Sequence, residues 1–106
     1  MELNKKRCVP CEAGTSPLSK IQSENYLRIV KGWTIKNMKL YKEFKFKNFK
    51  KTLKFVNKVG EIAEKEGHHP DIYFTWGKCT IELYTHSIKG LSENDFILAA
   101  KIDKIK

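Results

Sequence analysis

The sequence lacks a long apolar run: no stretch approaches the roughly 20 residues that a membrane-spanning helix needs. The N-terminal residues also lack the apolar core of a secretory signal peptide. Both absences argue against a membrane protein or a secreted protein. We therefore expect a cytoplasmic protein that has no membrane partner.

Cysteine is scarce as well, with three residues in 106. An odd number of cysteines in a reducing compartment predicts free thiols rather than disulfides. Cys8 and Cys11 form a Cys-x-x-Cys pair, but a zinc site would need a second pair, and only Cys79 remains. A thioredoxin-type site would need a preceding strand and a helix that begins at Cys8, and the sequence indicates neither. We expect no chemistry from this pair, with metal or redox chemistry as the alternatives.

Acidic residues are outnumbered, with 12 Asp and Glu against 21 Lys and Arg and a formal net charge of +9. This balance permits contact with nucleic acid or with an acidic partner. The lysines, however, are spread between apolar residues, which is typical of solvated faces, so we do not expect nucleic acid as a partner. A chain of this length can form one modest core, and a small core often gains stability by association. We therefore expect one domain that forms a homodimer or a homotetramer.

The N-terminal residues 1–15 show no usable periodicity, and we interpret them as a flexible arm. Ser16 and Pro17 match an N-cap followed by proline at the first helical position. This pattern predicts a short helix that ends near Arg28. A single folded domain is then expected over residues 16–106.

Two hairpins are indicated by runs in which polar and apolar residues alternate. The first would join residues 33–37 to residues 39–46, and the second would join residues 72–76 to residues 79–86. In the second hairpin we expect a turn at Gly77-Lys78 and a last strand that reaches His86. Alternate residues of that strand would then face the core.

A long amphipathic helix is predicted between the hairpins, over residues 49–66, with Asn48 as its N-cap and Gly67 as its stop. Its apolar face covers close to half of the circumference, which is broader than a helix needs to cover one sheet. A final helix is expected from Ser92 to about residue 104. The order α-β-β-α-β-β-α predicts an α+β fold of antiparallel hairpins with helices on one face.

All three histidines lie near the second hairpin, and histidine is the side chain that can both give and take a proton near neutrality. His68 and His69 are adjacent, so their side chains point in different directions, and Pro70 restricts the backbone of His69. A hairpin brings its two far ends together. We therefore expect His86 to approach the His68-His69 pair.

Three converging imidazoles leave three interpretations open. A zinc site is one, but the usual short spacing of two ligands on one element is absent, and adjacent histidines are awkward for a shared ion. Histidines with a structural or surface role are the second. A pair of acid and base histidines is the third, and we favour it because the cluster lies beside a proline and a glycine.

An ordered set of residues surrounds these histidines: Glu64, His68-His69-Pro70, Tyr73 or Trp76, Thr85-His86, and Gly90-Leu91-Ser92 followed by Asp95. This set resembles the signature of the pterin-4a-carbinolamine dehydratase family. The likeness continues upstream through Gly32-Trp33 and covers about residues 16–103. One departure is Ile72, where the family often has tryptophan, and it weakens the case for an aromatic wall at that position.

The resemblance implies one four-stranded antiparallel sheet with helices on one side. It also implies a hydro-lyase that dehydrates 4a-hydroxytetrahydropterin to quinonoid dihydropterin, in recycling of a tetrahydrobiopterin-type cofactor, without a metal or an organic cofactor of its own. Expulsion of hydroxide from C4a needs a general acid, and removal of the N5 proton needs a base. By analogy, His68 and His86 carry out these steps and His69 holds the pterin. The residues expected to contact the substrate are Glu64, Pro70, Trp76, Thr85 and Asp95.

Two alternatives stay open beside this interpretation. Asp95 is the third residue after Ser92, so it can also close a capping box at the start of the last helix. The family also includes a dimerisation cofactor of a transcription factor, so a binding module for a protein partner is the alternative function. The enzyme predicts activity that is lost in a folded His86→Ala variant, whereas partner binding would survive that substitution.

Overall fold

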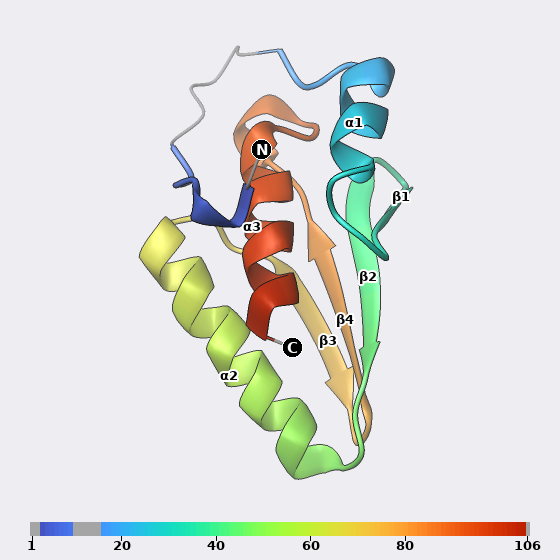
Figure 1. The fold of residues 1–106 in the computed structure, drawn as a ribbon, viewed down its shortest axis with the longest axis vertical. Helices are drawn as coiled ribbons and strands as arrows, with labels where there is room; N and C mark the ends of the chain where they lie inside the picture. The colour runs from blue at the N-terminus through green and yellow to red at the C-terminus, as the bar shows by residue number, and fades with distance from the viewer. Residues whose placement is uncertain (1–2, 10–15, 106) are drawn as a thin grey trace.

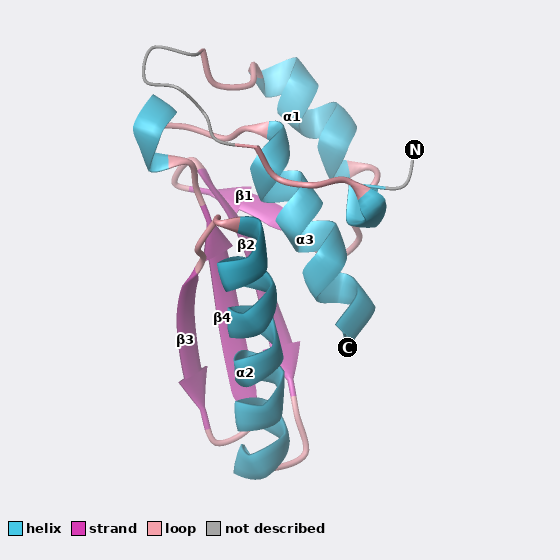
Figure 2. Ribbon diagram, turned by 90° about the vertical axis from the view of Figure 1, so that its left-hand side faces the viewer, coloured by secondary structure: helices cyan, strands magenta, loops and turns pink. Residues whose placement is uncertain are grey.

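One antiparallel sheet of four strands forms the first layer of the fold, and helices cover one of its faces (Figures 1 and 2). The computed structural model describes residues 3–9 and 16–105. The strands are β1 (Thr34–Lys36), β2 (Lys39–Lys45), β3 (Asp71–Thr75) and β4 (Lys78–Leu83). Their order across the sheet is β1-β2-β4-β3, so β2 and β4 join the two hairpins. The predicted α+β fold is confirmed.

Three α-helices make up the second layer: α1 (Lys20–Leu27), α2 (Phe49–Glu66) and α3 (Glu93–Ile105). Two short 3₁₀ turns, η1 (Leu3–Lys5) and η2 (His86–Ile88), complete the described elements. None of the helices in the described ranges is long and apolar enough to span a bilayer. The cytoplasmic location expected from the sequence stays a prediction.

The ends of α2 are the predicted ones, and its C-terminal end positions the first histidine. The Asn48 side chain accepts a hydrogen bond of 2.9 Å from the Lys51 N–H. Gly67 ends the helix in the left-handed region, at φ 65°, which glycine adopts without steric cost. The His68 N–H then donates to the Ala63 carbonyl, so His68 is held directly against the last turn of α2.

The first helix starts later than predicted. Ser19, and not Ser16, is its N-cap: the Ser19 hydroxyl accepts from the Gln22 N–H, and the Gln22 side chain accepts from the Ser19 N–H. This reciprocal capping box satisfies two backbone donors that would otherwise lack partners, whereas Pro17 offers none. The Leu18 N–H donates to the Leu91 carbonyl at 2.8 Å, which keeps the residues before Ser19 outside the helix.

The hairpins form with the predicted pairing, but the second one differs in its details. Thr75 pairs with Lys78, so its turn is Trp76-Gly77, one residue earlier than predicted. The expectation that His86 ends the last strand is wrong, because β4 ends at Leu83 and His86 begins η2. The reason is a closed loop, in which Thr85 and Gly90 exchange backbone hydrogen bonds of 3.0 and 3.4 Å.

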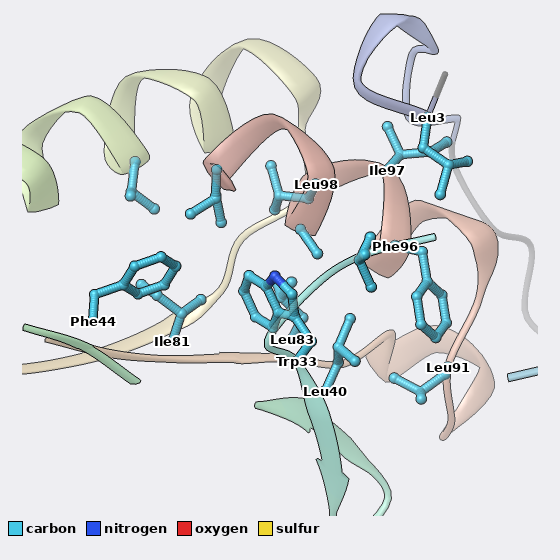
Figure 3. Close-up of a cluster of buried hydrophobic side chains, with 14 of the residues drawn as sticks. Leu3, Trp33, Leu40, Phe44, Ile81, Leu83, Leu91, Phe96, Ile97 and Leu98 are labelled. Carbon is cyan, nitrogen blue, oxygen red and sulfur yellow. The ribbon is translucent and has the colours of Figure 1, made fainter. Parts of the chain in front are cut away.

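The hydrophobic core lies between the sheet and the helices (Figure 3). Leu40 and Phe44 from β2 and Ile81 and Leu83 from β4 face it, and all four are buried. Alternate residues of β4 therefore point inward, as the sequence predicted. Phe96, from α3, is among the largest fully buried side chains of this core. The sheet face opposite the helices is the more exposed one on β3.

The N-terminal segment is packed against α3, although we expected a flexible arm over residues 1–15. Leu3 is 1% exposed and lies beside Ile97 in the core (Figure 3). The Lys101 ammonium donates to the Asn4 carbonyl at 2.9 Å. An apolar anchor and a part-buried hydrogen bond to the backbone thus hold this segment against α3. The domain boundary at residue 15 stays a prediction, and Cys11 of the Cys-x-x-Cys pair lies outside the described residues.

Candidate active site

A cavity of about 390 Å³ lies where the end of α2, the β4–η2 segment and the start of α3 meet. His68, His69 and His86 all line it, so the structure brings the three imidazoles to one cavity, as the hairpin argument predicted. Two larger cavities, of about 650 and 590 Å³, contain no histidine. The histidine cavity is in the size range of small-molecule sites, which begins at about 300 Å³.

His68 is paired with a buried carboxylate. Its Nε2 lies 2.6 Å from Oδ1 of Asp95, and Asp95 is 0% exposed. Oδ2 of Asp95 accepts from the Thr85 hydroxyl at 2.8 Å and from the Ser92 N–H at 3.0 Å. A buried carboxylate is tolerated only when its oxygens are satisfied in this way. Asp95 therefore orients His68 and leaves Nδ1 as the ring nitrogen for a ligand.

The capping role predicted for Asp95 is present together with its contact to His68. Asp95 accepts from the N–H of Ser92, the residue before α3. The single hydroxyl proton of Thr85 goes to Asp95, so in the 2.8 Å Thr85–Ser92 contact the Ser92 hydroxyl is the donor. Thr85 and Ser92 thereby fix the carboxylate from the side opposite His68.

His69 turns toward solvent and meets Glu64. Its Nε2 lies 2.7 Å from Oε1 of Glu64, and both side chains are mostly exposed. An exposed pair of this kind contributes little to stability, at most about 1 kcal/mol. Glu64 and Pro70 do not line the cavity. Glu64 can influence the cavity only through its contact with the His69 ring, and Pro70 only through the backbone of His69, which it follows in the chain.

His86 is the least engaged of the three histidines. It begins η2, and its ring stands edge-on to Tyr84, with ring centroids 5.0 Å apart. Within residues 3–9 and 16–105, no hydrogen bond or ion pair engages its imidazole. The ring is thus available to a ligand in the cavity.

Trp76 does not lie at this cavity within one chain. It is 66% exposed in the β3–β4 turn, and its carbonyl accepts from the Thr52 hydroxyl at 3.0 Å. Thr52 is in the first turn of α2, whereas His68 follows the last turn. At a rise of about 1.5 Å per residue, some 20 Å of helix separate Trp76 from the histidines. The substrate contact expected for Trp76 does not fit this geometry.

Residues that the sequence did not place at the site also line the cavity, among them Cys8, Val9, Glu66 and Asn94. Glu66 is the unexpected charge, because its side chain is only 3% exposed. Burial alone would raise its pKa, but the Cys8 N–H and the Lys101 and Arg7 cations together lower it. No spacing pattern links these residues, since 58 positions separate Cys8 from Glu66, so only the fold could reveal the group.

The thiol in the cavity is not a nucleophile at neutral pH. Burial, and to a smaller degree the Glu66 carboxylate, raises the pKa of Cys8 to about 11. The thiolate is the reactive form of cysteine, so Cys8 stays unreactive near pH 7. In the part of the chain that the structure describes, no group of three or more His, Cys, Asp or Glu side chains is arranged to hold a metal ion.

The site as a whole defines an α+β domain that is equipped for acid–base chemistry: three imidazoles line one cavity, and a buried carboxylate orients one of them. The sequence model described as pterin 4 alpha carbinolamine dehydratase matches residues 16–105. A protein of Alkaliphilus metalliredigens, provisionally named a pterin-4-alpha-carbinolamine dehydratase, is 51% identical over 104 residues, which are 96% of this chain and 94% of that protein. A protein of Rubrobacter xylanophilus with the same provisional name is 47% identical over 105 residues, which are 98% of each.

Solved structures agree with this match. A Brucella melitensis protein described as a transcriptional coactivator/pterin dehydratase has a TM-score of 0.81 at 29% identity, over 85% of this chain and 98% of that one. A pterin dehydratase-like protein described as a RuBisCO assembly factor in the alpha-carboxysome has a TM-score of 0.58 at 26% identity, over 69% of this chain and 84% of that one. The chain belongs to the pterin 4 alpha carbinolamine dehydratase family. Dehydratases are hydro-lyases, and the predicted enzyme class is confirmed.

Proposed function

We propose that the protein dehydrates 4a-hydroxytetrahydropterin to quinonoid dihydropterin in the histidine cavity, by general acid–base catalysis. The observation that carries the proposal is the convergence of His68, His69 and His86 on one cavity, with His68 held by Asp95. The family membership and the names of the relatives support the substrate class. The reaction is then one step in the recycling of a tetrahydrobiopterin-type cofactor, in which the product is reduced again.

The chemistry requires one proton donor and one proton acceptor. In the reaction the C4a–O bond breaks and the hydroxyl leaves as water after it accepts a proton. The N5 proton passes to a base, and the electron pair of the N5–H bond forms the C4a=N5 double bond. Each such group contributes about 10²–10⁴-fold to the rate.

His68 suits the role of the base. Its Nε2–H is directed to Asp95 at 2.6 Å, so in the neutral ring Nδ1 carries the lone pair that can accept the N5 proton. His86, whose ring is free of hydrogen bonds to the described residues, then serves as the acid that protonates the leaving hydroxyl. His69, paired with Glu64, binds the pterin without taking part in proton transfer.

The test is the rate of dehydration of 4a-hydroxytetrahydropterin, followed by ultraviolet absorbance, for wild type and for His68→Ala, His69→Ala and His86→Ala. We expect His68→Ala and His86→Ala to lower kcat by about 10²–10⁴-fold. His69→Ala should mainly raise KM. Circular dichroism of each variant controls for folding. Full activity in a folded His68→Ala, His86→Ala double variant would refute the proposed roles.

Self-association is the second part of the proposal, and exposed aromatic residues support it. β3 is an edge strand with an exposed aromatic residue on each of its faces: Phe74 lies beside Phe49 of α2 on the helix-covered face, and Tyr73 lies on the opposite face. An apolar patch on an edge strand is typical of an interface. We propose that a second copy covers this patch in a homodimer or homotetramer. Sedimentation velocity should show one of these species, and Phe74→Lys should shift it toward monomer, whereas a wild-type monomer would contradict the assembly.

A further inference from the structure

One wall of the histidine cavity is formed by residues outside the region that the family model matches, since that region begins at residue 16. This wall is formed by residues 7–9, which we call the N-terminal strap. Cys8 and Val9 of the strap line the same cavity as His68 and His86. Val9 is 64% exposed although it lines the cavity, so it lies at the cavity mouth. In Figure 1 the blue N-terminal segment runs beside α3.

Asn94 fixes the strap by its backbone. Its Oδ1 accepts from the Val9 N–H at 3.0 Å, and its Nδ2 donates to the Val9 carbonyl. A primary amide that engages both backbone groups of one residue forms the same pair of bonds as a neighbouring strand would. Asn94 is buried, so its amide holds Val9 at a place that is shielded from solvent.

Glu66 also fixes the strap, by a second backbone contact. Its Oε1 accepts from the Cys8 N–H at 2.9 Å, and its Oε2 is 3.4 Å from Nε of Arg7 and 3.7 Å from Nζ of Lys101. A carboxylate with such a small exposed fraction needs these partners. The strap is therefore joined to α2 through Glu66 and to α3 through Asn94.

We propose that the N-terminal strap is a substrate-contacting wall of the cavity, and that Asn94 and Glu66 are positioning residues that hold it there. The inference rests on the proposed function, because it concerns the same cavity. The strap closes a side that the histidines leave open, with the backbone and side chains of Cys8 and Val9. A preformed wall favours binding, because a segment that must first be ordered lowers the apparent affinity by the fraction of molecules in which it is docked.

The test combines two substitutions that remove the same contact from opposite partners in the full-length chain. Asn94→Ala removes both hydrogen bonds to Val9, and Val9→Pro removes the backbone N–H that donates to Oδ1 of Asn94. Each should raise KM for the hydroxypterin by roughly three- to thirtyfold, with kcat lowered less than KM is raised. The double variant should be no worse than the weaker-binding single variant, because both substitutions release one strap.

Thr52→Val is the matched control. Thr52 is also buried, and its hydroxyl donates to the Asn48 and Trp76 carbonyls at the far end of α2. It should lower the urea midpoint as Asn94→Ala does, but leave KM unchanged. Titration of each variant with 7,8-dihydrobiopterin, monitored by calorimetry, gives an affinity that does not depend on turnover. The affinity for 7,8-dihydrobiopterin should weaken in Asn94→Ala and Val9→Pro by the same factor by which KM rises.

The outcomes separate this inference from the proposed function. A folded wild type that neither turns over the hydroxypterin nor binds 7,8-dihydrobiopterin would refute the proposed function. A wild type that does both, with unchanged KM and affinity in Asn94→Ala and Val9→Pro, would refute the strap alone. Effects of the two substitutions that multiply in the double variant would also refute it, because they would then act at separate places.

Discussion

Substitution of Asp95 by asparagine tests how the site fixes the proton on His68. Asp95 receives three donors: His68 Nε2–H on Oδ1, and the Thr85 hydroxyl and the Ser92 N–H on Oδ2. Asparagine has the same shape but only one carbonyl oxygen. That oxygen best replaces Oδ2, where two donors converge, so the NH₂ group faces His68. His68 must then accept at Nε2 and carry its proton on Nδ1.

The expected loss follows from this change of tautomer. A proton on Nδ1 removes the lone pair that the proposed base needs, and the charge-assisted bond between His68 and Asp95 disappears with it. Such a bond is worth about 1.5–3 kcal/mol. At about 1.4 kcal/mol for each factor of ten, kcat should fall by about 10- to 150-fold or more. The same loss should lower the free energy of unfolding by a similar amount.

The assay is steady-state dehydration of 4a-hydroxytetrahydropterin, with urea unfolding of the same samples. Asp103→Asn is the matched control, because Asp103 is also an α3 carboxylate, and it accepts hydrogen bonds from Trp33 and Lys42 outside the cavity. The control should lose stability and keep kcat. An Asp95→Asn variant that is folded and turns over at the wild-type rate would refute the reasoning about the tautomer.

Three further predictions concern stability and reactivity. The folded-state pKa of Glu66 lies below its ordinary value of 4.5, so the ionised carboxylate stabilises the fold above that value, and this contribution is lost as the pH falls through the folded-state pKa. Urea midpoints should therefore fall less on acidification in Glu66→Gln than in wild type. Gly67→Ala should cost about 1–2 kcal/mol because of the positive φ, whereas Gly60→Ala, inside α2 and equally open to a Cβ, should be neutral or stabilising in the same urea assay. Burial raises the pKa of Cys79 to about 11, so alkylation of this thiol at pH 8 should require unfolding. Rapid labelling of Cys79 in the native protein, detected by peptide mass spectrometry, would contradict its burial.

The elements that could be predicted from the sequence are those whose ends are fixed by local chemistry. Asn48 and Gly67 bound α2 because a side-chain cap and a left-handed glycine act within one turn of the helix. The first hairpin was also predictable as a pair of alternating runs, and its two-residue turn is Asn37-Met38, with both residues at positive φ. Two nearby capping serines were harder to separate, because the choice of Ser19 over Ser16 depends on the Gln22 side chain and on a contact from Leu18 to Leu91.

The parts that could not be predicted depend on contacts distant in sequence. Leu3 is part of the core because it packs beside Ile97 of α3, and no local pattern in the first nine residues predicts that contact. Glu66 looks like one more solvated charge at the end of a lysine-rich helix until the N-terminal segment covers it. Trp76 was placed at the site by resemblance alone, and the length of β3 and β4 moves it to the opposite end of the sheet. The histidines were predictable because one helix end and one hairpin bring them together.

Dehydratase activity is tested by the rate at which wild-type protein accelerates the disappearance of 4a-hydroxytetrahydropterin, with and without a chelator. We expect an acceleration over buffer that the chelator does not change, and that falls by at least about 10²-fold in a folded His68→Ala, His86→Ala double variant. A folded wild type that gives no acceleration over buffer would show that the three converging histidines do not catalyse this dehydration.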